Sequence, residues 1–118
     1  MKLFQVVEIF PALQALGATK LSAKAGYRIA KAINLVRPEI KAYEEQRIKL
    51  AQELGTKSED GQHFRFEDTA AKAFMEQLNA LLDENCTIVL PTIAPDELGE
   101  IAIEPQHLAV LDGIVIKE

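Results

Sequence analysis

The sequence is poor in the residues on which most small-protein chemistry depends. Among its 118 residues it has one cysteine, Cys86, and two histidines, His63 and His107. A single cysteine excludes an internal disulfide framework and is typical of a reducing compartment. The histidines lie far apart and have no cysteine or acid cluster at ligand spacing, whereas a zinc site needs three or more protein ligands. We therefore expect no metal and no cofactor.

Long apolar runs are also missing. No stretch approaches the roughly 18 residues that a membrane span needs, and the N-terminal MKLFQVVEIFP lacks the cleavage site of a signal peptide. A content of 48% hydrophobic and 26% charged residues is typical of a soluble globular protein. We expect a cytoplasmic protein without a membrane partner. It should form a single domain, residues 1–118, with a helical body over 1–85 and a C-terminal cap over 86–118.

One helical pattern dominates the chain. Between residues 26 and 54, heptad positions recur at alternating intervals of three and four, which predicts one long helix with one apolar face. Thr19 or Ser22 can cap this helix at its start, and Gly55 ends it. We call the following positions the seam: Gly26, Ile29, Ile33, Val36, Ile40, Tyr43, Arg47, Leu50 and Leu54.

Two prolines fall within helical patterns. Pro11 lacks the amide that a helix interior needs, so we expect the first helix to begin near Val7 or Glu8 and to end at Gly17, with residues 2–6 extended. Pro38 lies inside the long helix. Because the seam stays in register on both sides of it, we expect a kink and not a break, at a cost of about 3 kcal/mol.

Residues 55–66, GTKSEDGQHFRF, change the pattern. The Asp60-Gly61 pair predicts a loop or a loose β-hairpin, with a short return strand at Phe64 and Phe66. Asp68 is a candidate N-cap for a third helix over residues 69–84. Its apolar positions repeat the spacing of the seam, so we expect an antiparallel helical hairpin with residues 26–54. These positions are Ala71, Phe74, Leu78 and Leu81.

The remaining residues predict a smaller unit of mixed structure. Residues 87–90 form a short β-branched run, and residues 100–104 alternate polar and apolar side chains, so we expect two short strands. Pro95 and Pro105 stand where helices begin, and Gly99 and Gly113 where they end, which predicts two brief helical turns. The fold class is therefore mainly α: a long kinked helix in an antiparallel hairpin, a short N-terminal helix and a small α/β C-terminal cap.

The charges are unevenly distributed. Residues 1–54 carry a net charge of +4 and residues 55–118 a net charge of −9. Lys20, Lys24, Arg28 and Lys31 predict a basic stripe opposite the seam. The stripe is either a footprint for nucleic acid or an acidic partner, or a solvated helix face balanced by the acidic half. We expect no aromatic residue interleaved with these cations to stack on bases, so we favour the solvated face and consider nucleic acid unlikely.

The chain resembles a family of small uncharacterised bacteriophage and prophage proteins. The resemblance spans most of the chain, including IKAYEEQRIKLAQELG, NALLDENCTI and ELGEIAIEPQHLAVLDGIVI, while Pro11 and Pro38 depart from it. It implies a phage context near the tail-morphogenesis genes, and it implies no catalytic motif or reaction. Its clearest residues are Leu21, Lys24, Tyr27, Ile29, Ala30 and Lys31, followed by Tyr43, Glu44, Glu45 and Arg47.

No catalytic residue can be nominated. Adjacent acids such as Glu44 and Glu45 diverge on a helix, and Glu45 pairs more naturally with Lys49, while Cys86 has no partner base. A small enzyme would need a pocket lined by His63 or His107.

We therefore expect a non-enzymatic interaction or assembly protein of phage origin, which binds itself or another phage protein in the host cytoplasm or the virion. The alternative is a regulator or inhibitor that binds a host protein or nucleic acid through the basic stripe. The seam position Arg47 is costly to bury unless its charge is paired or exposed, so it is a candidate for specifying a partner. The partner-binding candidates are Lys24, Arg28, Lys31, Tyr43 and Arg47.

Overall fold

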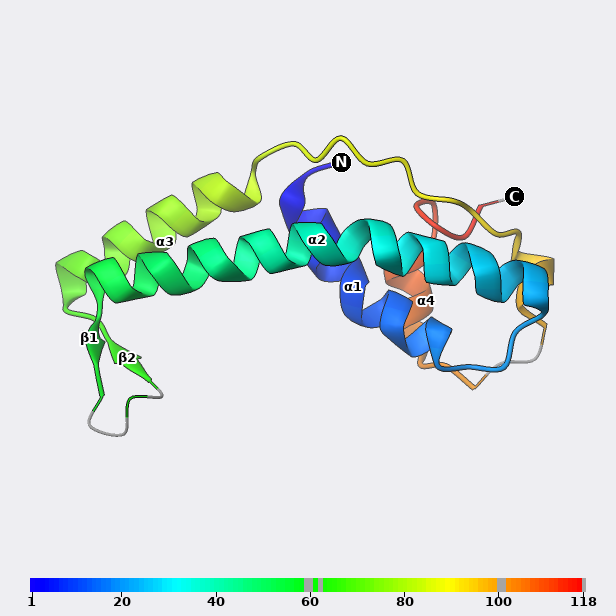
Figure 1. Cartoon of the computed structure of the whole chain (residues 1–118), viewed down its shortest axis with the longest axis horizontal. Helices are drawn as coiled ribbons and strands as arrows, with labels where there is room; N and C mark the ends of the chain where they lie inside the picture. The colour runs from blue at the N-terminus through cyan, green and yellow to red at the C-terminus, as the bar shows by residue number, and fades with distance from the viewer. Residues whose placement is uncertain (59–60, 62, 100–101, 118) are drawn as a thin grey trace.

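A computed structural model describes residues 1–58, 61, 63–99 and 102–117 of the chain. The molecule measures 50 × 30 × 22 Å, and a single long helix runs along it (Figure 1). The prediction of a mainly helical fold is confirmed. The elements are α1 (Leu3–Gly17), α2 (Ala23–Leu54), β1 (Thr56–Lys57), β2 (Phe64–Arg65), α3 (Asp68–Leu82), the 3-10 helix η1 (Pro95–Leu98) and α4 (Pro105–Leu111).

Helix α2 begins and ends as its sequence predicts. The Ser22 hydroxyl oxygen accepts a hydrogen bond from the Ala25 amide at 3.2 Å, and Gly55 follows the last turn. The helix continues through Pro38, and Figure 1 shows one gently bowed ribbon. Pro38 and Asn34, whose carbonyl loses its helical partner, are both exposed. Water can therefore hydrate that carbonyl, which lowers the cost of keeping a proline inside the helix.

The prediction for the first helix is wrong at its start. Helix α1 begins at Leu3, so residues 3–6 are helical and Pro11 lies in the middle of the helix. The Gln5 side chain accepts a hydrogen bond from the Lys2 amide at 2.8 Å and so caps the first turn. The apolar face of α1 is buried along its whole length, and this burial offsets the hydrogen bond that Pro11 removes.

Helices α2 and α3 form the predicted antiparallel hairpin. The two-stranded antiparallel sheet lies between them in the chain, with Thr56 opposite Arg65 and Lys57 opposite Phe64. Helix α3 begins one residue earlier than expected, because Asp68 belongs to its first turn and Glu67 is the N-cap residue. Figure 1 shows that α3 accompanies only the C-terminal part of α2. Helix α1 packs on the other part of α2, and α4 packs against α1.

The C-terminal cap is less regular than its sequence suggests. Both helical turns are confirmed, with Pro95 and Pro105 at their first positions. The strand predicted at residues 87–90 is wrong, because these residues belong to no strand. Of the strand predicted at residues 100–104, the first two residues lie outside the described part of the chain, and residues 102–104 are not in a strand. The cap instead contains isolated bridges, such as the one between Ile93 and Ile116.

The buried residues divide the molecule into two regions. We call residues 1–43 and 86–117 the head, and residues 44–85 the arm. One buried cluster accounts for almost the entire core, and all its members lie in the head. They are Leu3, Val6, Ile9, Ala12, Leu13, Leu16, Ala25, Ile29, Ala32, Val36, Tyr43, Cys86, Ile93, Leu111, Val115 and Ile116.

Candidate interaction surfaces

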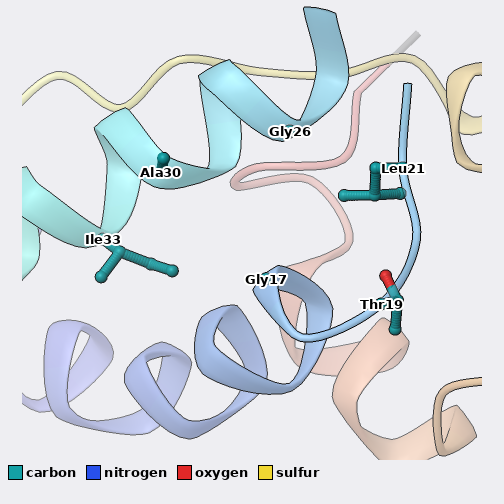
Figure 2. A pocket seen from close by; sticks show the side chains of 6 residues that line it. All are labelled: Gly17, Thr19, Leu21, Gly26, Ala30 and Ile33. Atoms are coloured by element: carbon teal, nitrogen blue, oxygen red, sulfur yellow. The ribbon is translucent and has the colours of Figure 1, made fainter. Parts of the chain in front are cut away.

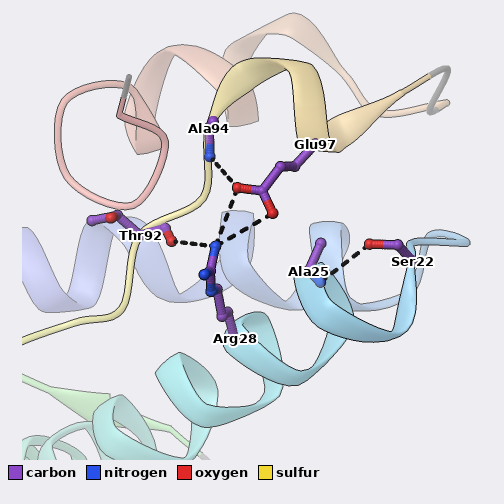
Figure 3. A network of polar contacts seen from close by, with 6 residues as sticks. All are labelled: Ser22, Ala25, Arg28, Thr92, Ala94 and Glu97. Atoms are coloured by element: carbon purple, nitrogen blue, oxygen red, sulfur yellow. Dashed lines mark hydrogen bonds and ion pairs between the residues drawn. The ribbon is translucent and has the colours of Figure 1, made fainter.

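Arg28, a predicted member of the basic stripe, is engaged within the chain. Its guanidinium donates to the Glu97 carboxylate, with an Nη1 to Oε1 distance of 3.1 Å, and to the Thr92 carbonyl at 3.5 Å (Figure 3). Glu97 also accepts a hydrogen bond from the Ala94 amide at 3.0 Å. This bond, and then the charges of Arg28 and Lys24, hold the pKa of Glu97 below its ordinary value. Arg28 thus fastens the segment around η1 to α2.

The exposed part of the basic stripe is smaller than predicted and includes an aromatic residue. Lys24 and Lys31 are exposed, whereas Lys20 precedes the helix. Tyr27 lies between the two lysines on the same helical face, and 67% of its surface is exposed. The expectation that no aromatic is interleaved is therefore wrong, although the three-residue spacing from Lys24 to Tyr27 signals it. A hollow of about 270 Å³ borders this face, lined by Tyr27, Ala30, Lys31, Asn34 and Leu35.

Two predicted partner-binding residues on the seam differ in how much of their side chain a partner could contact. Tyr43 is buried in the core of the head with 8% of its surface exposed, so a partner cannot reach most of it. Arg47 is partly exposed, and its guanidinium contacts Glu44 on the same helix, with an Nη2 to Oε2 distance of 2.7 Å. Its charge is thus paired and partly hydrated, which removes the cost expected for a buried charge. Among the described residues, no ion pair joins Glu45 to Lys49.

The arm exposes apolar side chains. Ala51 is the only buried residue that the structure describes between positions 44 and 85, and no side chain of α3 is buried. Ile48 on α2 and Met75 on α3 are 44% and 51% exposed. At the tip, the Phe66 and Phe74 rings pack with centroids 4.8 Å apart. The apolar face of α3 is therefore only half covered by α2.

The seam position Gly26 makes no close contact with a neighbouring helix. A Cβ atom at Gly26 would meet nothing within 4 Å, whereas a Cβ at Gly17 would lie 3.0 Å from Ile33 Cδ1. Gly26 instead borders a hollow of about 190 Å³ between α1 and α2 (Figure 2). The hollow has no free polar side chain, because the Thr19 hydroxyl donates to the Leu16 carbonyl at 2.7 Å. Nothing in it indicates a polar ligand. Its lining is Gly17, Thr19, Leu21, Gly26, Ala30 and Ile33.

Cys86 lies in the core, as expected of a small buried hydrophobic residue. Its Sγ atom lies 3.6 Å from Glu39 Oε2. Burial, followed by the negative charge of Glu39 and this hydrogen bond, raises the pKa of the Cys86 thiol. A raised pKa keeps the thiol protonated, whereas a nucleophilic cysteine needs a lowered one. His63 is exposed and His107 is partly exposed, and neither lines any of the hollows described here.

Neither a metal centre nor a membrane-spanning helix is present among the residues that the structure describes. No group of three or more His, Cys, Asp or Glu side chains there is arranged to hold a metal ion. No helix in that part of the chain is long and apolar enough to cross a membrane. Comparisons with protein-family models, with characterised proteins and with solved structures gave no match. The resemblance to phage proteins therefore stays a prediction.

Proposed function

We propose that this chain is a non-enzymatic assembly protein that associates with a second copy of itself through the arm. The observation that supports this most directly is the incomplete burial of α3. This helix is amphipathic, with apolar residues repeating at intervals of three and four, yet none of its side chains is buried. A second arm is a suitable cover, because two helical hairpins can pack into a four-helix arrangement that buries all four apolar faces.

The charge and the apolar area of the arm are compatible with self-association through this surface. The two helical parts of the arm, residues 44–54 and 68–82, carry three Lys or Arg against five Asp or Glu, so a net charge of −2 per copy opposes the contact only weakly. Ile48 and Met75 add apolar area beside the half-buried seam. An exposed apolar surface of this kind marks an interaction site more often than a solvated face.

The biological setting in this proposal comes from the sequence resemblance. We propose a role in phage or prophage morphogenesis, in the cytoplasm of the host cell or within the virion. The partner would then be another copy of this chain or a further phage protein.

The mass of the purified protein in solution tests self-association. We expect light scattering to give an oligomer for the wild type and a smaller mass for Ile48→Glu and Met75→Glu, because each change places a charge on the proposed contact. Both side chains are substantially exposed in the monomer, so the fold should tolerate either change. Gln77→Glu is the matched control, since it adds the same charge at an exposed polar position of α3. A monomeric wild type, or unchanged masses for both arm variants, would contradict the proposal.

The alternative function, a regulator or inhibitor, is favoured by one observation. Tyr27, Lys24 and Lys31 together present an exposed aromatic ring between two cations, which suits an acidic protein or a nucleic acid. Charge reversal at Lys24 and Lys31 should abolish such binding without unfolding the protein. Arg28 is a poor choice for this test, because its reversal would also break the contact with Glu97. Binding that survives reversal at both lysines would exclude this surface.

A further inference from the structure

The segment that connects α3 to η1 has the sequence of a strand but no strand partner. We call residues 87–91, TIVLP, the strap. Figure 1 shows the strap as part of an extended connection that passes over the head. The amides on both sides are paired: Cys86 donates to the Met1 carbonyl at 2.7 Å, and Ile93 donates to the Val115 carbonyl at 2.8 Å. The strap is therefore held at both ends.

From Thr87 to Leu90 the burial of the strap alternates as it does in a surface strand, and Pro91 after them is half-buried. Ile88 and Leu90 are half-buried and pack against the core of the head, whereas Thr87 and Val89 are exposed. Val89 is 90% exposed, the highest value among the exposed large hydrophobic residues. A period of two is what an extended chain gives when one of its faces lies on a protein surface.

The backbone of the strap is unpaired. Within the part of the chain that the structure describes, no amide or carbonyl group of residues 87–91 takes part in a hydrogen bond. A row of free donors and acceptors on an apolar, extended segment is the defining property of an unprotected edge strand. No charged side chain within the strap discourages pairing with another chain.

We propose that the strap is an edge strand that pairs antiparallel with the strap of a second copy of this chain. The sequence favours an identical partner, because it is nearly symmetric about Val89, with Ile88 and Leu90 on either side and Thr87 and Pro91 beyond them. A two-fold axis at Val89 pairs each residue with the one equally far along the strap on the other side of Val89, so this near-symmetry places uncharged side chains opposite one another along the whole strap.

One register allows the free backbone groups of the two straps to form hydrogen bonds with each other. If Val89 faces Val89 of the second copy at a non-hydrogen-bonded position, Ile88 and Leu90 of one strap exchange both backbone bonds with Leu90 and Ile88 of the other. Pro91 then faces Thr87 at a non-hydrogen-bonded position, where its missing amide costs nothing. A hollow of about 350 Å³ beside the strap, bordered by Gln5, Gly113 and Ile114, leaves room along this edge. The contact is separate from the arm and does not depend on it.

Cysteine cross-linking tests the register. With Val89→Cys, the two new thiols would lie opposite each other, at a Cα separation of about 4.5 Å, and a mild oxidant should link the copies as a disulfide dimer. Thr87→Cys is the matched control, because it is exposed on the same face, yet its symmetry mate would lie about 13 Å away. Wild-type protein shows how much disulfide-linked dimer forms through Cys86 alone. We expect covalent dimer from Val89→Cys at least about tenfold faster than from Thr87→Cys. Equal rates would overturn the proposal.

Charge pairing provides a second, independent test. In a Met75→Glu background, which removes the arm contact, Val89→Glu and Val89→Lys should each weaken the dimer when measured alone, because like charges then face each other directly. Mixing the two variants should restore it. The exposure of Val89 means that neither change threatens the fold. A dimer that persists in both variants, or a mixture that stays as weak as its components, would overturn the strap pairing. Ile48→Glu and Met75→Glu address the arm alone, so failure of one contact is distinguishable from failure of the other.

Discussion

The head and the arm are built on the same long helix, yet only the head has a core. Along α2, the seam positions Ile29, Val36 and Tyr43 are buried in the head, whereas Leu50 and Leu54 in the arm are half-buried. The heptad spacing is equally regular in both regions. Periodicity therefore shows which face of a helix is apolar, and it does not show how completely that face is covered.

The difference arises from what packs against each half of α2. In the head, Ala25 and Ala32 are completely buried, and these small side chains let neighbouring segments approach α2 closely. Helix α1 then packs along this part of α2, α4 packs against α1, and Arg28 joins the segment around η1 to α2. In the arm, α3 is the single helical neighbour, and one neighbour leaves much of an amphipathic helix in water.

The largest expected effect compares one leucine in each region. Leu13→Ala should lower the free energy of unfolding by about 3 to 5 kcal/mol, because Leu13 is completely buried and its loss leaves a cavity. Leu50→Ala should cost only about 1 to 2 kcal/mol, since Leu50 is already partly in water. Urea unfolding of both variants below the concentration at which the protein associates measures the two costs. An equal loss at Leu50 under these conditions would mean that α3 covers the arm more completely in the monomer than the partial exposure of Leu50 indicates.

Two glycines give a smaller contrast of opposite sign. Gly55→Ala should destabilise the protein by about 1 to 3 kcal/mol, because the new Cβ would lie 2.8 Å from the Ala51 carbonyl oxygen and 3.0 Å from the Phe66 ring. Gly26→Ala should stabilise it by about 0.5 to 1 kcal/mol, because the Cβ enters open space and alanine favours the helix. Thermal unfolding of both variants measures the effect. A stabilising Gly55→Ala would mean that the tip of the arm is looser than the packing of Phe64 and Phe66 indicates.

The sequence predicts the elements of this fold better than their packing. The limits of α2, the helical hairpin and the turns at Pro95 and Pro105 follow from local rules for caps, prolines and periodicity. The start of α1 at Leu3 does not follow from these local rules, because burial of a whole face of the helix outweighs the local cost of Pro11. Residues 87–90 have the composition of a strand, but a strand exists only where a partner is present, and composition alone does not reveal the partner.

The candidate surfaces were harder to predict than the helices, for two reasons. In the sequence, Arg28 is a candidate for binding a partner, because Glu97 is distant in the chain and only folding brings the two side chains together. The heptad pattern places Tyr43 on the seam but does not show which part of the seam other segments cover, and Tyr43 lies in the core of the head. The spacing of Lys24, Tyr27 and Lys31, in contrast, is local and could have identified Tyr27.

The smallest expected effect concerns the ion pairs of the two regions. In the arm, Arg47 pairs with Glu44 on its own helix, whereas in the head Arg28 joins α2 to the distant segment around Glu97. Since the pKa of Glu97 is lowered in the folded state, its contribution to stability is present above the ordinary glutamate pKa of about 4.3 and is lost as the pH falls through the lowered value. The stability difference between wild type and Glu97→Gln should therefore be visible at neutral pH and disappear in acid.

The same comparison in an Arg28→Gln background separates the causes of that lowered pKa. The hydrogen bond from the Ala94 amide is the largest of them, so the pH dependence should shrink without Arg28 but persist. Urea midpoints measured across the acid range for the wild type, the two single variants and the double variant provide the data. If the pH dependence of stability vanishes completely when Arg28 is replaced, the charge of Arg28 and not the Ala94 amide holds Glu97 ionised. The link between α2 and the cap would then be an ion pair alone, similar in strength to the pair of Arg47 and Glu44 in the arm.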